Sequence, residues 1–181
     1  MPITINGSGT VTGISAGGLP DGIIQSADLA AGVGAGKLLN IYYGSTETQV
    51  TVNTPSRTDT GVAVTFTPAA LGSTFYIQIN QYGRNGVSGD QALFNLYLMR
   101  SIDGGTASEI EAYYYLGNYT SNDTAYWGSP LGYKDTPSYS AGETINYHME
   151  VGFYTANYSL SYRAQEGTNM GSSIFVYELG A

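Results

Sequence analysis

Apolar and polar residues alternate along most of the chain from residue 38 onward. The alternation is clearest over 62–67, where Pro68 ends it, and over 75–82. This pattern is typical of a strand with one buried face. Segments 38–44 and 47–52 are predicted as one further strand or a pair of strands. Other strands are predicted over 93–100, 109–116, 144–151, 158–164 and 172–179.

Turn and loop signals separate these segments. Polar loops are expected over 55–61 and 83–90. A tight turn is expected at 103–105, which makes 93–116 a hairpin. Residues 117–142 are rich in Tyr, Ser, Asn, Gly and Pro, and we expect a long loop there with at most one short strand near Tyr126.

About eight strands with no helices between them predict an all-β fold. Turn signals every 8–12 residues favour an antiparallel β-sandwich, jelly-roll-like, over a parallel α/β sheet. The last strand, 172–179, is expected inside a sheet because terminal residues fray unless they are tied down. These strands form a predicted head of residues 37–181.

The segment before the head, residues 1–36, is predicted as an arm and a short helical collar. Asp21 or Ser26 can cap a helix, and apolar residues follow at roughly helical spacing. Such a short helix is marginal alone, so it needs the head or copies of itself as partners. Residues 3–14 alternate only weakly, so we expect this arm to be disordered in the free monomer or packed on something else.

Composition narrows the class of protein. The absence of cysteine excludes disulfides, thiolate catalysis and cysteine-ligated metals. Six basic against fourteen acidic residues give a net charge of −8, which disfavours nucleic-acid binding. No apolar run is long enough to span a membrane, and the start has no secretion signal pattern. Seventeen tyrosines and only 11% charged residues favour a long-lived extracellular or virion assembly.

No motif predicts catalysis. The glycine-rich segment 31–38 lacks the spacing and the Ser or Thr after the lysine that a phosphate-binding loop needs. His148 lies in an alternating strand, where a structural role is expected. Glu109 and Glu111 are expected on one solvent-facing side of a strand rather than across a glycosidase cleft. No cluster resembles a calcium loop or a histidine metal site. We therefore expect no enzyme, no cofactor and no metal.

The tyrosine-rich segment is the strongest candidate for binding. Aromatic rings offer flat apolar area with a polar tip, which suits stacking on sugars and protein recognition. The predicted glycan- or receptor-binding residues are Tyr119, Trp127, Tyr133 and Tyr139, with the first three expected to be exposed in loops. The alternative is that half of the tyrosines in this segment pack in the core or between subunits.

Two segments carry a resemblance to a known group of proteins. The arm over 3–22 and the closing strand over 172–181, with its apolar-x-Glu-apolar ending, resemble the small fibre and decoration proteins of tailed phages, especially cyanophages. The segment 37–68 has the rhythm of that group but not its usual residues, and the tyrosine-rich segment matches nothing in it. The resemblance covers about a third of the chain.

The resemblance implies a virion structural protein, a homotrimer with a β-sandwich head and an arm that docks into the tail or capsid. The arm would contact other virion proteins through Ile3, Ile5, Val11 and Ile14. A trimeric coil at the collar would bury Ile23, Ile24, Leu29 and Val33 around a threefold axis.

Two functions are compatible with this resemblance. One is a tail or side fibre whose head binds host surface polysaccharide during adsorption. The alternative is a head fibre or cement protein that decorates the capsid. A third option, a polysaccharide-degrading enzyme, is disfavoured because the chain lacks a long repeat body.

Overall fold

The computed structural model describes residues 37–48, 50, 52, 56–85, 94–116, 125–153 and 171–180, within the unit Gly34–Ala181. The predicted arm and collar over 1–36 and the predicted strand over 158–164 lie outside the described residues. The described residues form eight strands and no helix that could cross a membrane. The strands are β1 (Leu38–Thr46), β2 (Thr58–Phe66), β3 (Thr74–Asn85), β4 (Phe94–Ile102), β5 (Ser108–Leu116), β6 (Ala125–Asp135), β7 (Ile145–Phe153) and β8 (Ser172–Leu179).

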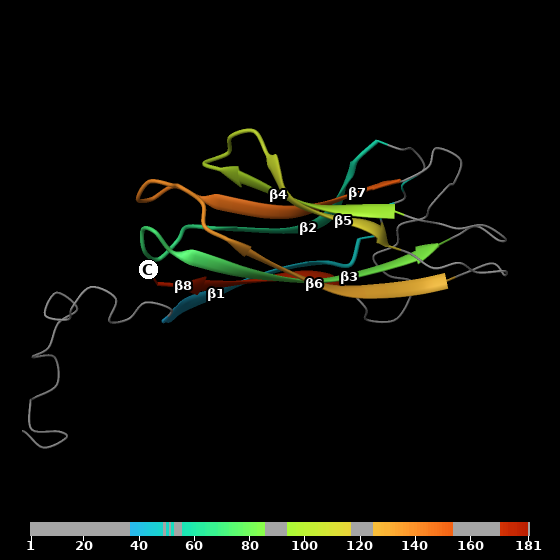
Figure 1. The fold of residues 1–181 in the computed structure, drawn as a ribbon, viewed down its shortest axis with the longest axis horizontal. Coiled ribbons are helices and arrows are strands. Elements are labelled where there is room, and N and C mark those ends of the chain that lie inside the picture. The colour runs from blue at the N-terminus through green and yellow to red at the C-terminus, as the bar shows by residue number, and fades with distance from the viewer. Residues whose placement is uncertain are drawn as a thin grey trace, which may run out of the picture. The chain divides into compact units, whose positions relative to one another are not determined.

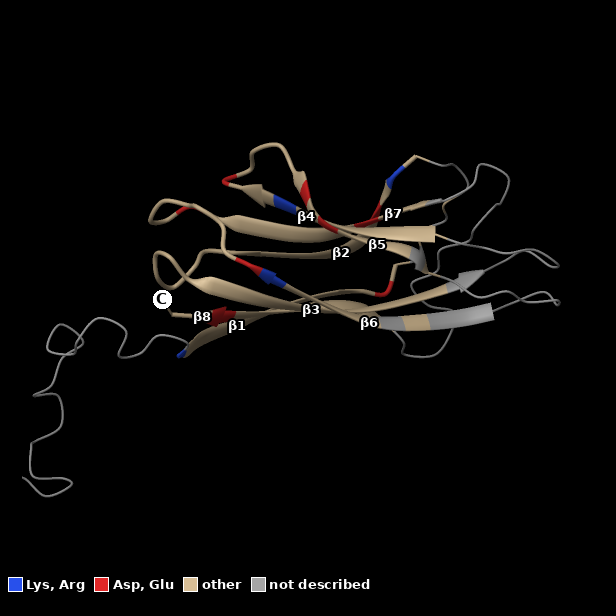
Figure 2. Ribbon diagram, in the orientation of Figure 1, with Lys and Arg blue, Asp and Glu red and all other residues tan. Residues whose placement is uncertain are grey.

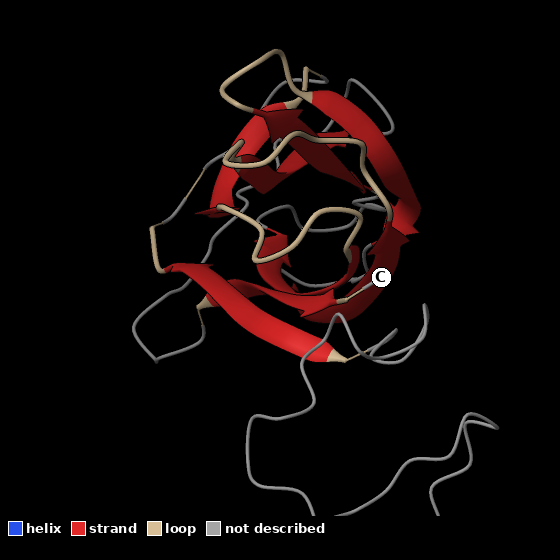
Figure 3. Ribbon diagram, turned by 90° about the vertical axis from the view of Figure 1, so that its left-hand side faces the viewer, coloured by secondary structure: helices blue, strands red, loops and turns tan. Residues whose placement is uncertain are grey.

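The strands form two four-stranded sheets that face each other, as Figures 1 and 3 show. One sheet has the order β1-β8-β3-β6 and the other the order β2-β7-β4-β5. Every pair of neighbours is antiparallel. The structure therefore confirms the all-β prediction of an antiparallel sandwich. The last strand, β8, lies between β1 and β3, inside a sheet as expected.

The core lies between the two sheets because each strand turns one set of alternating side chains inward. In β2 the alternation seen in the sequence places Val62, Val64 and Phe66 inside and the residues between them outside. Phe75 of β3 and Tyr147 of β7, from opposite sheets, are fully buried, and their rings contact each other. Burial of such side chains contributes about 1.5–3 kcal/mol each, so this alternation supplies most of the stability of the head.

Strand β6 corrects the prediction of a long loop over 117–142 with at most one short strand near Tyr126. It runs for 11 residues beside β3, so Trp127 and Tyr133 lie in a strand rather than a loop. Its outward positions in the register with β3 include Gly128, Pro130 and Gly132, which have low strand propensity. Because β6 is the edge of its sheet, the proline is tolerated there.

One other boundary differs, and the predicted hairpin is present. β1 ends at Thr46, so 47–52 does not continue as a full strand, although Val52 is buried in the core. The predicted hairpin of β4 and β5 is present, with positive φ at Asp103 and Gly104. Positive φ at both central residues is typical of a two-residue hairpin turn, which confirms the predicted tight turn.

Gly44 allows β1 of one sheet to approach β2 of the other. A Cβ at this position would overlap the carbonyl oxygen of Ala63 and lie 2.8 Å from its carbonyl carbon. Backbone atoms cannot move aside as a flexible side chain would. We expect Gly44→Ala to lower the free energy of unfolding by about 1–3 kcal/mol, the usual range for overpacking, as measured by urea denaturation. Gly132→Ala is the control, since its Cβ would lie 3.8 Å from the nearest atom outside its own neighbours. An equal loss in both variants would contradict this account.

Candidate functional site

The outer face of the sheet β2-β7-β4-β5 carries a cluster of an arginine, two tyrosines and a glutamate. In β4, Leu96 and Leu98 face the core, so Tyr97 between them faces outward. Tyr97 is nevertheless only 8% exposed. The guanidinium carbon of Arg57, from the segment just before β2, lies 3.6 Å from the centre of the Tyr97 ring. This is a cation–π contact that covers the ring and orients the arginine.

Glu109 at the start of β5 holds the other side of the arginine. The distance from Arg57 Nη2 to Glu109 Oε2 is 2.5 Å. Burial would lower the pKa of Arg57, but the hydrogen bond and charge of Glu109 raise it. Both side chains are more than a third exposed, so the pair adds little to stability. Its effect is to fix a donor and an acceptor at the surface.

Tyr114 supplies the exposed ring of the cluster. Its side chain is 57% exposed. Its ring meets Tyr97 edge to face, with 6.5 Å between the ring centres and an angle of 89° between the planes. Tyr97 thus contacts both the accessible Tyr114 ring and the guanidinium of Arg57, which is paired with the Glu109 carboxylate. A ligand with an apolar face and a rim of hydroxyl groups matches this chemistry.

The neighbouring strand β7 adds polar groups to the same face. Glu150 lies opposite Tyr97 in the register, and His148 lies opposite Met99. His148 is 3.6 Å from Glu150 through Nε2 and 3.0 Å from Asn146 Oδ1 through Nδ1. These contacts suit the structural role expected for His148. Figure 2 shows both acidic and basic positions along the strands of this sheet.

Glu109 and Glu111, predicted on one face of a strand, lie on either side of a register shift in β5. Glu111 lies opposite Leu98, whereas Glu109 lies opposite Met99. Since Leu98 and Met99 point to opposite faces of β4, the two glutamates do not form a same-face pair. The described residues contain no group of three potential metal ligands.

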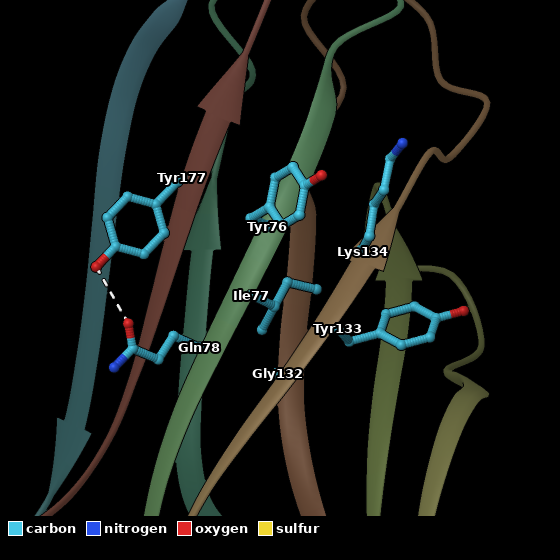
Figure 4. Close-up of a pocket in the computed structure, with 7 residues that line it drawn as sticks. All are labelled: Tyr76, Ile77, Gln78, Gly132, Tyr133, Lys134 and Tyr177. Atoms are coloured by element: carbon cyan, nitrogen blue, oxygen red, sulfur yellow. Dashed lines mark hydrogen bonds between the residues drawn. The ribbon is translucent and has the colours of Figure 1, made fainter. Parts of the chain in front are cut away.

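The predicted binding residues are distributed differently from this cluster. Tyr133 of β6 packs partly against the core and lines a hollow on the other sheet (Figure 4). Tyr139 lies after β6; its hydroxyl donates to the Ala70 carbonyl oxygen at 2.5 Å and accepts from the Ser73 N–H at 3.1 Å. This favours the packing alternative for Tyr139. Tyr119 and the side chain of Trp127 lie outside the described residues, as do all the arm and collar residues.

Sequence reasoning did not select Arg57, Tyr97 or Tyr114. Tyr114 belongs to the Tyr113-Tyr114-Tyr115 run, and the period of two could have marked it, because Tyr113 packs against the core and Tyr114 points the other way. Arg57 lies in a predicted loop, and no local spacing links it to β4 or β5. Only the fold brings the three residues together.

Comparisons with known proteins give little further information. No protein-family model matches the chain, and no curated protein matches it. Among solved structures, one match is described as the structure of Eiger TNF from S. frugiperda. It has a TM-score of 0.38 and 10% sequence identity, and the match covers 80% of this chain and 94% of that chain. This similarity is too low to bear on function.

Proposed function

We propose that the chain is a phage virion structural protein, a homotrimeric tail or side fibre whose β head binds host surface polysaccharide. In this proposal residues 1–36 form the arm and helical collar and dock onto other virion proteins. Residues 37–181 form a jelly-roll head that is exposed on the particle. The basis for the virion assignment is the resemblance over 3–22 and 172–181.

The strand order supports the jelly-roll part of the proposal. A jelly roll has eight antiparallel strands in two sheets built from two Greek keys. The orders β1-β8-β3-β6 and β2-β7-β4-β5 are compatible with that arrangement, with successive strands placed mostly in opposite sheets. Such a head needs no disulfide, in agreement with a chain that has no cysteine.

The observation that carries polysaccharide binding is the exposed Tyr114 ring. It contacts Tyr97, whose ring also holds Arg57 and, through Arg57, Glu109 on the same face of the sheet. An aromatic ring can stack on the apolar face of a sugar, while the guanidinium donates and the carboxylate accepts hydrogen bonds at its rim. The cluster has one arginine against Glu109 and the nearby Glu150, and the chain has a net charge of −8. Like charges repel, so we propose a neutral rather than an acidic polysaccharide.

Replacing Tyr114 with alanine should weaken binding to a neutral polysaccharide about tenfold, the equivalent of ~1.4 kcal/mol. The loss follows from removing the exposed ring. Binding is measured by affinity electrophoresis with dextran and mannan as neutral polymers and alginate as a carboxylated one. Leu71→Ala is the control, since Leu71 has the same 57% exposure but lies outside the cluster.

The outcomes separate the parts of this proposal. Binding to neither class of polymer would contradict polysaccharide recognition. A preference for alginate would contradict the neutral class. An equal effect of Leu71→Ala would contradict the position of the site.

A capsid decoration protein is the second candidate, because apolar side chains are exposed on the sheet opposite the cluster. Leu38, Ile41 and Tyr43 of the edge strand β1 are each about half exposed. A cement protein requires such contacts along its base. Cryo-electron microscopy of the intact particle distinguishes the two: density at the tail supports a fibre, and density on the capsid lattice supports decoration.

A further inference from the structure

The outer face of the sheet β1-β8-β3-β6 forms a continuous aromatic and apolar surface, hereafter the aromatic face. Two rows of register partners cross all four strands. The first row is Ile41, Tyr177, Tyr76 and Lys134, and the second is Tyr43, Phe175, Gln78 and Gly132. The rings of Tyr43 and Phe175 pack with 4.8 Å between their centres. Because these partners are neighbours in the sheet, their side chains form one surface.

Exposed large apolar side chains gather on this sheet. Most of the exposed large apolar side chains among the described residues lie on these strands, with Tyr43 57%, Ile41 49%, Leu38 48%, Tyr76 46% and Tyr82 36% exposed. Single exposed apolar residues need no explanation, but a contiguous group is typical of a surface that another molecule covers. The opposite face of the sandwich is instead occupied by the polar Arg57 cluster.

The charges on the aromatic face indicate what covers it. Lys134 is the only charged residue in the two rows, which contain no carboxylate. The whole chain carries −8, so two copies repel each other through most surfaces. A face without acidic groups is where two such copies can approach without that repulsion. The composition of the aromatic face also matches that of interface centres, which are rich in aromatic residues and poor in charged ones.

A hollow in the aromatic face provides a place for a side chain from another copy. It has a volume of about 440 Å³ and includes Tyr76, Gln78, Lys134 and Tyr177 in its lining. Figure 4 shows its lining residues on β8, β3 and β6, with Gly132 on β6. Tyr43 lies in the second row, the row of Gln78 and Gly132, but on β1, outside the hollow. The Tyr43 side chain of one copy and the hollow on the next copy are complementary but different patches. A cyclic oligomer such as a trimer is built from contacts between two different patches.

We propose that the aromatic face is covered by a second copy of this chain and forms the subunit contact of the assembled head. This inference rests on the homotrimer in the proposed function and places its contact in the head rather than in the collar alone. The Arg57 cluster, on the other sheet, then remains accessible for polysaccharide. Each copy uses one face for assembly and the opposite face for binding.

The test measures the oligomeric state of the full chain by sedimentation velocity and multi-angle light scattering. Wild type is expected as three chains of 19.1 kDa each. Tyr76→Glu should reduce the mass to one chain by placing a carboxylate on the face. Gly132→Leu should do the same without adding charge, because it fills the hollow and its Cβ position is open within the chain. Ala63→Glu and Ala63→Leu, at an exposed position of β2, are the matched controls and should remain oligomeric.

Each outcome bears on the inference. A monomeric wild type at micromolar concentration, or an unchanged mass in both face variants, overturns it. If Tyr76→Glu fails to fold by circular dichroism, Gly132→Leu decides. Monomeric face variants that still bind dextran through Tyr114 support the inference and the binding proposal separately. If the face variants are monomeric but neither they nor wild type bind dextran, the result supports the interface and contradicts the binding proposal.

Discussion

Asp135→Ala is expected to lower the free energy of unfolding by about 3–5 kcal/mol, the range found when one partner of a buried ion pair is removed. Asp135 is at the end of β6 and is 7% exposed. Its carboxylate accepts two hydrogen bonds of 2.8 Å from Arg100 Nη1, one at each oxygen. It accepts a third, also of 2.8 Å, from the hydroxyl of Tyr147.

The effect is large because these three residues join the two sheets. Asp135 belongs to one sheet, whereas Arg100 of β4 and Tyr147 of β7 belong to the other. Burial raises the pKa of Tyr147, and the nearby Asp135 carboxylate raises it further, so the hydroxyl stays protonated and donates. Without the carboxylate, Arg100 keeps a largely buried charge and Tyr147 loses its acceptor inside the core.

The measurement is urea denaturation followed by circular dichroism at fixed protein concentration, since assembly also affects stability. Tyr147→Phe should cost about 1 kcal/mol, because it removes one hydrogen bond and leaves the ion pair. Glu109→Ala serves as the surface comparison: its pair with Arg57 is exposed and should be worth below about 1 kcal/mol. If Asp135→Ala costs no more than Glu109→Ala, the network is not the link between the sheets that its geometry indicates.

The strands that could be predicted from sequence are those whose outward residues are ordinary strand formers. β2 and β3 alternate apolar with polar residues, and the structure places them as expected. β6 was predicted at most as a short strand near Tyr126, because glycine and proline occupy its outward positions and are loop signals when read locally. They are tolerated in β6 because it is an edge strand with Leu131, Tyr133 and Asp135 turned inward. Whether a strand lies at the edge depends on the strand order of the whole sheet, which the local sequence does not give.

The candidate site was less predictable than the fold for a related reason. Arg57, Tyr97 and Tyr114 come from three separate segments, and their contact depends on the strand order β2-β7-β4-β5. The register shift in the β4–β5 pair, which separates Glu109 from Glu111, is likewise set by pairing. Periodicity gives the face of each residue within a strand but not its neighbours across strands.

Glu178 is a case in which the alternation itself reveals an unusual residue. In β8 the inward positions are Ser172, Ile174, Val176 and Glu178, so a carboxylate takes a core position. It is fully buried. Its two oxygens accept hydrogen bonds of 2.9–3.1 Å from the N–H groups of Ala69 and Ala70 and of 2.7 Å from the hydroxyls of Ser73 and Tyr42. The last strand thereby holds the turn between β2 and β3.

Glu178→Gln is expected to lower the free energy of unfolding by about 2–4 kcal/mol near neutral pH, because the amide cannot accept from all of these donors and leaves some of them unpaired in the interior. Glu143→Gln is the control, since Glu143 accepts one hydrogen bond, from Ser140 N–H, at an exposed turn. Urea denaturation of both variants and wild type gives the comparison. Equal losses would show that the buried carboxylate has no special role.

The pH dependence of the stability difference between wild type and Glu178→Gln tests whether the charge of the Glu178 carboxylate causes it. Burial alone would raise the pKa of Glu178, but the hydrogen bonds from Ala69, Tyr42, Ser73 and Ala70 outweigh it and lower the pKa below its ordinary value of 4.5. The unfolded state therefore binds a proton at higher pH than the folded state does. The stabilisation is complete above the unfolded pKa and is lost as pH falls through the lower folded pKa. The gap between wild type and Glu178→Gln should thus be constant from pH 7 to about 5 and narrow below 4.5. A gap that stays constant down to about pH 3 would mean that packing, rather than the carboxylate charge, makes Glu178 important.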